Sequence, residues 1–319
     1  MLRYALASAG VCVAAPWLAR AAAQAGPLRA PDANGLRLPD GFTSRIVARS
    51  GQSPIGPGAY VWPSSPDGGA CFASGDGGWI YACNSELPAG EGGVGALRFA
   101  ADGRIVDAYP LLRGTTLNCA GGATPQGTWL SCEEFPRGQV WECDPLGARP
   151  AVARPALGTF AHEAVAVDLA GQRYYLTEDT PTGRFYRFTP AAYPDVAHGA
   201  LEVAQVVGGT TGAVKWWPVP EPRTSANELV PQSTAFSGGE GVAWAAGVVY
   251  FATKYDNRVW AYDTAAERLR ILYDDDEDPV LRGVDNLVIS PAGDVVVAED
   301  GGSMQLVVVD QRGVATPLA

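Results

Sequence analysis

The feature that most constrains the fold is a succession of short strand-like segments along almost the whole chain. Segments rich in Val, Tyr, Trp and Phe alternate with turns of Gly, Asp and Pro about every 8 to 12 residues. One unit reads Thr128-Trp-Leu-Ser-Cys132 and then Gln139-Val-Trp-Glu-Cys143, and another reads Val248-Val-Tyr-Phe-Ala-Thr253 and then Arg258-Val-Trp-Ala-Tyr262. Helical periodicity is almost absent after the N-terminal stretch. The pattern predicts an all-β protein.

The repeated units are similar to one another and small. A sheet of this size cannot bury its own apolar face, so several units must stack to form a core. Stacking around a common axis is the arrangement of propeller blades. We therefore expect residues 26–319 to form a single β-propeller domain with six blades.

The first 25 residues have the composition of an export signal. Arg3 precedes a run of small apolar residues that ends at Leu18, and an Ala-rich cleavage signature follows at Ala23 to Ala25. The apolar run is too short to span a bilayer, and Pro16 interrupts it. We expect residues 1–25 to be a signal peptide and the mature protein to be periplasmic or extracellular, with no stable membrane span.

The charge balance argues against one class of partner. The chain has 23 Lys and Arg against 34 Asp and Glu, which gives a formal net charge of -11. Binding to nucleic acid needs a basic surface that displaces the counterions of the phosphates, and the sequence contains no basic cluster. We expect no nucleic-acid partner and a monomer that acts on a small molecule. The excess of carboxylates fits a site for multivalent cations.

The cysteines leave one thiol over. One of the six lies in the signal peptide, and the other five enter a compartment that permits disulfides. Cys71 and Cys83 flank one turn, and Cys132 and Cys143 flank another, so each pair could be bridged, although buried thiols within strands are an equally ordinary outcome. Cys119 has no partner in this scheme. Its place in an Asn-Cys-Ala-Gly-Gly turn suggests a metal ligand.

Polar residues recur at equivalent points of the units. The openings of four units carry Asn118-Cys119, His162-Glu163, Gly239-Glu240 and Asp285-Asn286. The second segments of three units end in acids, at Glu133-Glu134, Glu178-Asp179 and Glu299-Asp300. In a propeller, groups at one level of each blade converge on the central channel. The alternative is that each acid caps a turn.

Converging carboxylates would require a cation. Glu133, Glu163, Glu240 and Asp285 would repel one another unless a hard ion neutralised them, and oxygen ligands in this number suit Ca²⁺ or ferric iron. A thiolate from Cys119 would add a transition metal, because a soft sulfur ligand has little affinity for Ca²⁺. With only two histidines and no G-x-S-x-G elbow, a His-rich zinc site and a serine-hydrolase triad are poorly supported.

Several ordered motifs resemble those of the PhoX-type alkaline phosphatase family. They are Asn118-Cys-Ala-Gly-Gly122, Gly127-Thr-Trp-Leu-Ser-Cys-Glu-Glu134, Phe160-Ala-His-Glu163, Thr177-Glu-Asp179 and Phe185-Tyr-Arg-Phe188. The matching blocks run in order from about Trp62 to the end of the chain. The resemblance implies a six-bladed propeller, export, and a centre of ferric iron and calcium that hydrolyses phosphomonoesters.

The resemblance also implies a ligand set. Cys119 matches the family's iron-bridging cysteine, and the acids of the later blocks match its metal-binding carboxylates, with the choice between Glu133 and Glu134 left open. We expect metal ligands among the following residues: Cys119, Glu133, Glu134, Glu163, Glu240, Asp285, Asn286 and Glu299. We assign the catalytic role to Cys119, Glu163 and Glu240.

The sequence departs from the family pattern at two places. Where the family commonly reads Arg-Pro-Glu, this chain reads Gly238-Gly-Glu240, so a guanidinium that would hold the phosphate is missing. Where the family often reads Asn-His-Glu, this chain has Asn84-Ser-Glu86. The chain is also short for the family, with compact loops.

Two other functions fit part of the pattern. A calcium-dependent lactonase or esterase propeller of the gluconolactonase type would use Gly239-Glu-Gly-Val-Ala-Trp244 and Asp285-Asn-Leu287 as ligand segments, and it would have no task for Cys119. A non-catalytic extracytoplasmic propeller would hold metals for stability alone, and Gly238 would then mark a lost active site.

Overall fold

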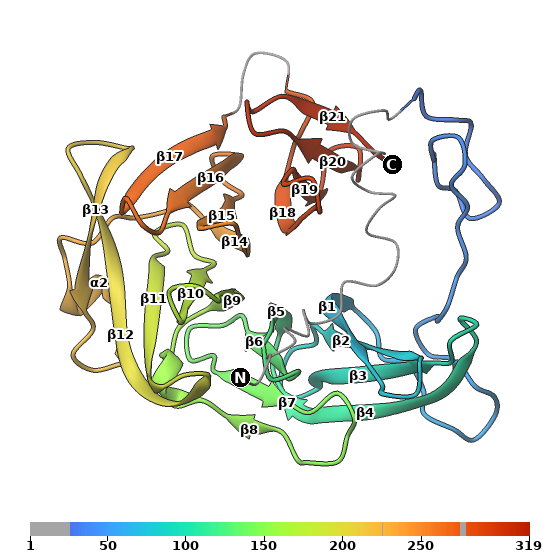
Figure 1. The fold of residues 1–319 in the computed structure, drawn as a ribbon. Helices are drawn as coiled ribbons and strands as arrows, with labels where there is room; N and C mark the ends of the chain where they lie inside the picture. Colours follow the sequence, from blue (N-terminus) through green and yellow to red (C-terminus); the bar gives the residue numbers. More distant parts are fainter. Residues whose placement is uncertain (1–25, 225, 275–278) are drawn as a thin grey trace, which may run out of the picture.

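The computed structural model describes residues 26–224, 226–274 and 279–319. The expected signal peptide, residues 1–25, lies outside this part of the chain. The described residues form an all-β ring of sheets, with one 3₁₀ turn, η1 (Pro155–Leu157), and one short helix, α2 (Ala226–Leu229) (Figure 1). The predicted fold class is confirmed. No described helix has the length and apolarity needed to cross a membrane.

The strands form five blades, each an antiparallel meander of four strands. Blade I contains β1 (Pro66–Ala73), β2 (Trp79–Ser85), β3 (Gly92–Phe99) and β4 (Ile105–Thr115). Blade II contains β5 (Asn118–Ala123), β6 (Trp129–Glu133), β7 (Val140–Cys143) and β8 (Val152–Ala153). Blade III contains β9 (His162–Asp168), β10 (Arg173–Glu178), β11 (Phe185–Ala192) and β12 (Asp195–Val207). Blade IV contains β14 (Gly239–Ala245), β15 (Val248–Thr253), β16 (Arg258–Asp263) and β17 (Arg268–Tyr273). Blade V contains β18 (Val284–Ile289), β19 (Val295–Glu299), β20 (Leu306–Val309) and β21 (Ala315–Pro317).

An additional strand joins two of the blades. Strand β13 (Gly212–Pro218) pairs with β12 from Ala213 to Pro218, and its start pairs with β17 through Gly212 and Ala213. Blades III and IV therefore share one nine-stranded sheet. The indole of Trp216 packs under the guanidinium of Arg187, 4.5 Å from the ring centre. The segment around Lys215 is thus an outer strand of the ring rather than a lid over the axis.

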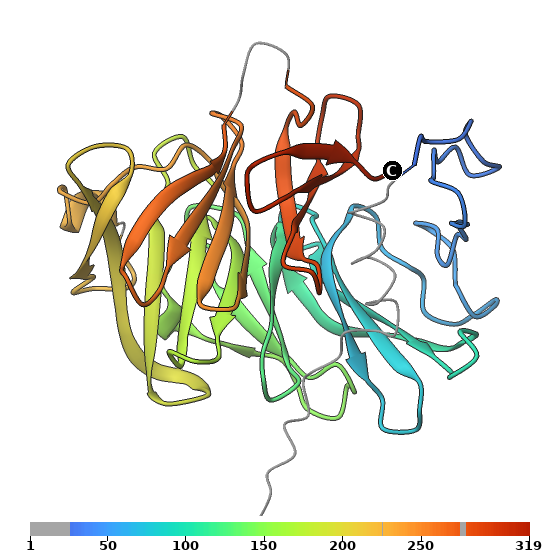
Figure 2. The same cartoon turned by 45° about the horizontal axis from the view of Figure 1, so that its top comes forward.

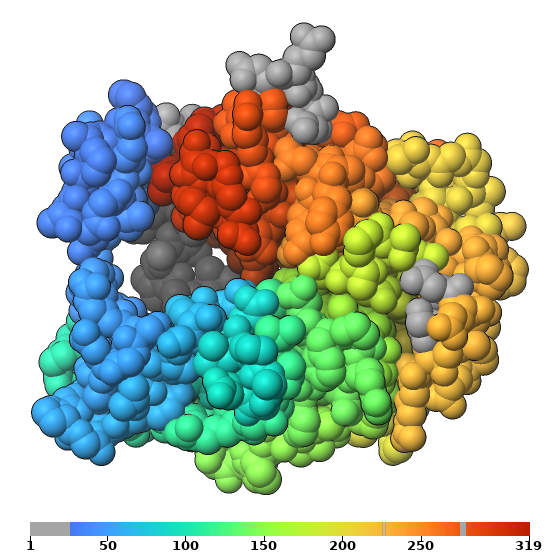
Figure 3. Space-filling view, turned by 180° about the vertical axis from the view of Figure 1, so that it is seen from behind, coloured from blue at the N-terminus to red at the C-terminus, as the bar shows by residue number. Residues whose placement is uncertain are grey.

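The sixth sector of the ring contains no blade. Residues 26–65 run as irregular backbone between blade V and blade I, shown in blue in Figure 2. In the space-filling view they form a lobe of their own beside the packed blades (Figure 3). Trp62, just before blade I, is buried against its apolar residues. The predicted count of six blades is not confirmed, because the described residues form five.

The core lies between neighbouring blades. Blades III and IV meet through aromatic rings, with Phe185 and Phe251 stacked at 4.4 Å between centroids. Blades II and III meet around Leu130, Tyr174 and Tyr186, all of them buried. Burial of apolar area between sheets contributes roughly 25 cal/mol per Å², so these contacts fix the blades relative to one another.

The first two strands of every blade share one irregularity. Each pair has a β-bulge at the same point, where two residues of the first strand face one residue of the second. The two bulged residues are 67 and 68 in blade I, 119 and 120 in blade II, 163 and 164 in blade III, 240 and 241 in blade IV, and 285 and 286 in blade V. The first strands border the ring axis (Figure 1), so the bulges aim a side chain from each blade towards it.

The cysteine pairs do not form disulfides. In the observed register Cys132 faces Val140 and Cys143 faces Trp129, while Cys71 faces Tyr81. Cys132 and Cys143 are buried in strands, as is Cys83. The alternative of buried thiols is therefore the one the structure shows.

Candidate metal centre

One side chain from each bulge forms what we call the first ring. Its members are Asp67, Cys119, Glu163, Glu240 and Asp285. The residue after each is small or compact because neighbouring blades approach closely there. A Cβ added to Gly68 would lie 2.7 Å from Ala120 Cα, and one added to Gly241 would lie 2.6 Å from Asn286 Cα.

A second ring lies beside the first. In each blade it consists of the residue that directly follows the second strand, namely Glu86, Glu134, Asp179, Lys254 and Asp300. Residues of the rings form two groups, and within each group the ligand atoms lie within 4.8 Å of one another. One group is Glu86, Cys119 and Glu134, and the other is Glu163, Glu240 and Asp285.

The last residue of the second strand has a different task. The Glu133 carboxylate accepts bonds from the backbone N–H of Thr116 at 2.9 Å and from the indole of Trp141 at 3.0 Å. Glu299 likewise accepts from the backbone N–H groups of Arg282 and Gln305. Each carboxylate thus fastens the loops at its own blade end, which is the turn-capping role that sequence alone could not exclude.

The structure therefore divides the predicted ligands. It places Cys119 and Glu134 in one group and Glu163, Glu240 and Asp285 in the other, so that Glu134 rather than Glu133 lies beside Cys119. It does not bring Glu133 or Glu299 into either group. The Asn286 side chain accepts the backbone N–H of Leu287 at 2.9 Å and also stays outside the two groups.

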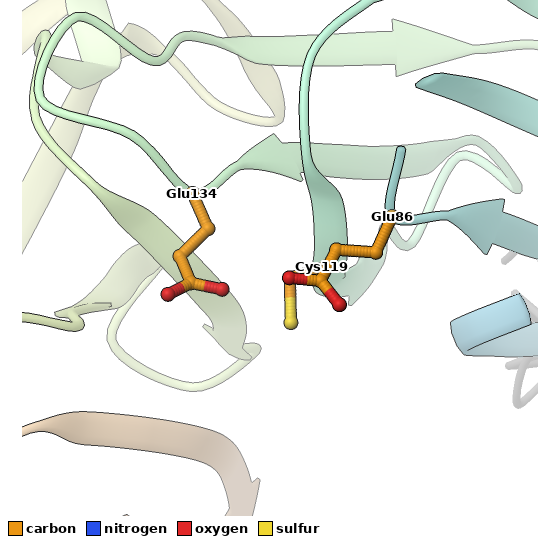
Figure 4. Close-up of side chains that lie close together, drawn as sticks. All are labelled: Glu86, Cys119 and Glu134. Atoms are coloured by element: carbon orange, nitrogen blue, oxygen red, sulfur yellow. The ribbon is translucent and has the colours of Figure 1, made fainter. Parts of the chain in front are cut away.

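Cys119 connects the two groups. Its side chain is directed between the carboxyl groups of Glu86 and Glu134 (Figure 4). The thiol donates to Glu163 Oε1 at 3.4 Å and lies 3.6 Å from Asp67 Oδ1. A soft sulfur atom is therefore surrounded by hard oxygen atoms from four blade segments.

A buried asparagine holds the backbone of this cysteine. Asn84 of blade I donates its amide hydrogens to the carbonyls of Cys119 at 3.0 Å and Ala120 at 2.7 Å. Its own oxygen accepts from the indole of Trp129 at 2.8 Å and from the hydroxyl of Ser131 at 2.9 Å. All four bonds of a fully buried amide are thus made. This network accounts for the Trp and Ser of the Gly-Thr-Trp-Leu-Ser-Cys motif.

The same kind of contact recurs at the junction between blades III and IV. Thr177 faces the bulge of blade III, as Asn84 faces that of blade I. Its hydroxyl donates to the carbonyl of Glu240 in blade IV at 2.6 Å. Each of these two polar groups therefore positions a first-ring residue of the following blade.

The two glycines after Cys119 are required by close approach of backbone. A Cβ on Gly121 would lie 1.9 Å from the carbonyl oxygen of Leu130, and one on Gly122 would lie 2.0 Å from that of Val165. Any larger residue would force β5 away from β6 or from blade III. The Asn-Cys-Ala-Gly-Gly sequence thus fixes where the thiol lies.

The acids of the two rings are poorly stabilised in the absence of a cation. Burial, followed by the charges of Glu240 and Glu134, raises the pKa of Glu163 well above its ordinary value. Burial and hydrogen bonding to Asp179 raise the pKa of Glu134 to about 8. Burial also raises the pKa of Asp67 to about 6 and that of the Cys119 thiol well above its usual range. These groups are held in a site that disfavours their charged forms.

The donor set fits bound metal ions. Glu163 is 1% exposed, and its Oε2 atom has no hydrogen-bond partner among the described residues. A buried polar atom without a partner is costly, and a cation would satisfy it. Some carboxyl groups contact each other directly, such as Glu86 with Glu134 and Glu240 with Asp285. A cation bound between the two groups of such a pair would offset the repulsion between their charges. The residues present therefore fit a metal centre.

His162 does not belong to this centre. Its ring is buried against Phe160, and one ring nitrogen lies 3.2 Å from the carbonyl of Gly158. Burial lowers the pKa of His162 to about 3, so the ring is neutral. It occupies the position opposite Glu178 at the blade end, and it supports the fold beside Glu163.

Comparison with known proteins identifies the family of this chain. The family model described as "Alkaline phosphatase PhoX" matches residues 88–140 and 135–267, which together span more than half of the chain. The protein belongs to the PhoX alkaline phosphatase family. No curated protein sequence matches the chain.

Solved structures resemble this PhoX-family fold to different degrees. Pseudomonas fluorescens PhoX in complex with vanadate is 16% identical, with a TM-score of 0.68, and the match covers 88% of this chain and 86% of that one. The gluconolactonase XC5397 from Xanthomonas campestris is 15% identical, with a TM-score of 0.45 over 79% of this chain and 75% of that one. A chain of the nidogen/laminin complex is 11% identical, with a TM-score of 0.48 over 75% and 78%.

A pocket of about 650 Å³ opens next to the centre of this PhoX-family chain. Its wall includes Ala161, which pairs with Glu134 and accepts the backbone N–H of Asp179 at 3.0 Å. Arg137 and Arg223 also line it, and neither forms an ion pair with a described residue. The wall also includes one acid, Glu178, whose carboxylate accepts hydrogen bonds from the Arg184 backbone N–H and the Tyr186 hydroxyl. The two guanidinium groups outnumber this acid and make the pocket favourable for an anion.

Sequence reasoning missed part of the centre. Asp67 lies in a Pro-Asp-Gly-Gly stretch without a strand signature, and Glu86 and Asp179 were noticed only as parts of motifs. Lys254 gives no signal of this kind, because a lysine is not a metal ligand. Alignment of the second-strand ends would have found the second ring, since each member follows directly after such a strand.

Proposed function

We propose that this protein is an exported phosphomonoesterase that acts on small phosphate esters at a centre of calcium and ferric iron. Membership of the PhoX family supports a phosphoesterase of the alkaline phosphatase type. The observation that carries the proposal is the meeting of Cys119 with acids from both rings around one axis. We further propose that residues 1–25 direct export and that the protein acts as a monomer.

The two groups of ligands differ in chemistry, and we assign the ions accordingly. The group containing Cys119 would hold ferric iron with Glu86 and Glu134, because thiolate ligands select transition metals. Glu163, Glu240 and Asp285 offer only oxygen atoms and would hold Ca²⁺. When bound, the metal ions supply Lewis-acid polarisation of the phosphate oxygens.

The protein's own groups fix the geometry. Asn84 and Thr177 hold the backbones of Cys119 and Glu240, so the donor atoms of these two residues are preorganised before substrate arrives. The Cys119 thiol must lose its proton to bind a metal, and Glu163 Oε1 lies where it can receive that proton. Cys119, Glu163 and Glu240 are therefore the residues to which we assign the catalytic role. Positioning of this kind supplies much of the rate in phosphoryl transfer.

The neighbouring pocket suits the alcohol part of the ester. Its walls combine apolar groups such as Phe160 with the guanidinium groups of Arg137 and Arg223. A small organic leaving group could lie there while its phosphate faces the centre. Pseudomonas fluorescens PhoX binds vanadate, a transition state analogue, which supports phosphoryl transfer as the reaction class.

The proposal is tested by substitution of the thiol. Protein purified with iron and calcium should release phosphate from p-nitrophenyl phosphate, and Cys119→Ala should reduce this activity at least about 100-fold, comparable with the loss of a metal-tuning group. Cys143→Ala is the matched control, because Cys143 is also a buried thiol of blade II and packs among apolar residues instead of the metal ligands.

Wild-type protein that contains both metals but leaves phosphomonoesters intact would contradict the proposed reaction. Equal activity of Cys119→Ala and Cys143→Ala would contradict the role of the thiol. Lactone hydrolysis that is indifferent to Cys119→Ala would instead identify a calcium-dependent lactonase.

A further inference from the structure

Lys254 breaks the pattern of the second ring. The equivalent position in the other four blades is an acid: Glu86, Glu134, Asp179 and Asp300. Lys254 directly follows β15, and its backbone N–H donates to the carbonyl of Gly238 at 2.8 Å, so the position itself is the same. A cationic side chain therefore stands where the repeat would place another carboxylate.

The ammonium group bridges two blades. Nζ lies 2.5 Å from Asp179 Oδ2 of the blade III end and 2.7 Å from Glu240 Oε1 of blade IV. Both carboxylate side chains are only 4% exposed. Within the described residues, no other cation forms an ion pair with either ring. Lys254 thus gives the centre a positive charge that is part of the chain and cannot dissociate.

The backbone around Gly238 leaves space for this lysine. Gly238 has φ +72°, and a Cβ added to it would lie 2.8 Å from Lys254 Cγ and 2.7 Å from the Tyr255 ring. A side chain at position 238 and the observed course of Lys254 therefore exclude each other. The conformation of Lys254 therefore depends on the glycine at position 238.

We propose that Lys254 takes the place of one metal ion, so that this chain binds fewer ions than a ring with an acid at that position would. The inference rests on the proposed metal centre. Calcium lies about 2.3 to 2.6 Å from its oxygen ligands, so an ion bridging Asp179 and Glu240 would need the space that the ammonium occupies. The ammonium also reduces the repulsion among the remaining acids without dissociating.

The test compares metal content and stability rather than activity alone. The chain has only two lysines, and the exposed Lys215 is the matched control. After dialysis against excess Ca²⁺, Lys254→Met and Lys254→Glu should each contain one more calcium ion per chain than wild type, measured by mass spectrometry of the elements. Lys254→Arg and Lys215→Met should match the wild type. Metal-free Lys254→Met should melt at a lower temperature, and calcium should restore this loss.

The outcomes separate the inference from the proposed function. A wild-type protein that binds no metal would contradict the proposed centre. A wild type that binds metal, together with Lys254→Met of identical calcium content, would overturn the inference alone. An unchanged calcium content with a raised KM for the ester would assign Lys254 to the substrate instead.

A second measurement needs no variant. Acetylation of the metal-loaded wild type, followed by peptide mass spectrometry, should modify Lys215 at least about tenfold faster than Lys254, because two buried carboxylates hold the Lys254 ammonium whereas Lys215 is exposed. Equal rates at the two lysines would show that metal binding displaces Lys254, and this result would overturn the inference.

Discussion

Raising the pH should destabilise the metal-free protein. Glu134 has a folded pKa of about 8 against an ordinary value of 4.5, so the folded state holds a proton that the unfolded state releases. The stability gained from this proton is complete below pH 4.5 and is lost as the pH rises towards 8. The loss is about 1.4 kcal/mol per pH unit for one such group. Between pH 5 and 7 this amounts to about 3 kcal/mol, or about 2 kcal/mol after allowance for the partial exposure of Glu134.

The loss is large enough to measure by thermal unfolding. A change of 2 kcal/mol lowers Tm by about 4 to 8 °C in a domain of this approximate size. Asp67, with a pKa of about 6, adds to the loss at the acidic end of this range. Circular dichroism melts of chelator-treated protein at pH 5, 6 and 7 measure the effect. Glu134→Gln should flatten the dependence, whereas Glu91→Gln, which removes a charge from an exposed site, should leave it unchanged.

Bound metal should stabilise the protein more as the pH rises. Cations bind the deprotonated carboxylates, so the affinity for metal rises with pH, and the Tm difference between loaded and metal-free protein should widen from pH 5 to 7. A metal-free Tm that stays constant or rises over this range would refute the electrostatic reasoning. A Glu134→Gln variant with the wild-type pH dependence would show that another group is responsible.

Two further changes test the positioning network and the pocket. Asn84→Ala leaves the carbonyls of Cys119 and Ala120 without their donor and should destabilise the protein by about 3 kcal/mol in a urea melt, with weaker iron binding, whereas unchanged iron affinity would exclude a positioning role. The double variant Arg137→Gln and Arg223→Gln should raise the KM of an ester that carries a second anionic group by a few-fold at low salt and leave kcat unchanged. A change of this size corresponds to a loss of about 1 kcal/mol or less in binding free energy. If the double variant and the wild type have the same KM for the charged ester, as they should for a neutral ester, the pocket does not hold the leaving group.

The fold class could be predicted because strand periodicity is a local property. The segments around Trp129, Tyr174 and Phe251 show it clearly, and all three lie in the second strands of blades. The blade count could not be predicted in this way. Residues 26–65 fill the sixth sector without strands, and their many Pro and Gly residues give no strand pattern to count.

The candidate site was predictable only in part, for a geometric reason. Neighbouring residues of a strand face opposite sides, so either Glu133 or Glu134 could have faced the axis. The bulge then changes this alternation, because Cys119 and Ala120 together face a single residue of the next strand. A register shift of one residue depends on tertiary pairing and leaves no signal in a single sequence.

Lys254 illustrates a second limit. A sequence indicates metal ligands through residue type, and a lysine among acids has the wrong charge for a ligand. Its role follows from its position in the repeat and from the space above Gly238, which only the folded backbone shows.

The most direct test is the metal content of the wild-type protein after chelator treatment and reconstitution with both ions. Elemental mass spectrometry should find iron and calcium together in a fixed ratio per chain, with the iron lost in Cys119→Ala and retained in Cys143→Ala. Calcium without iron, or neither metal, would contradict a centre built on Cys119 and the two rings.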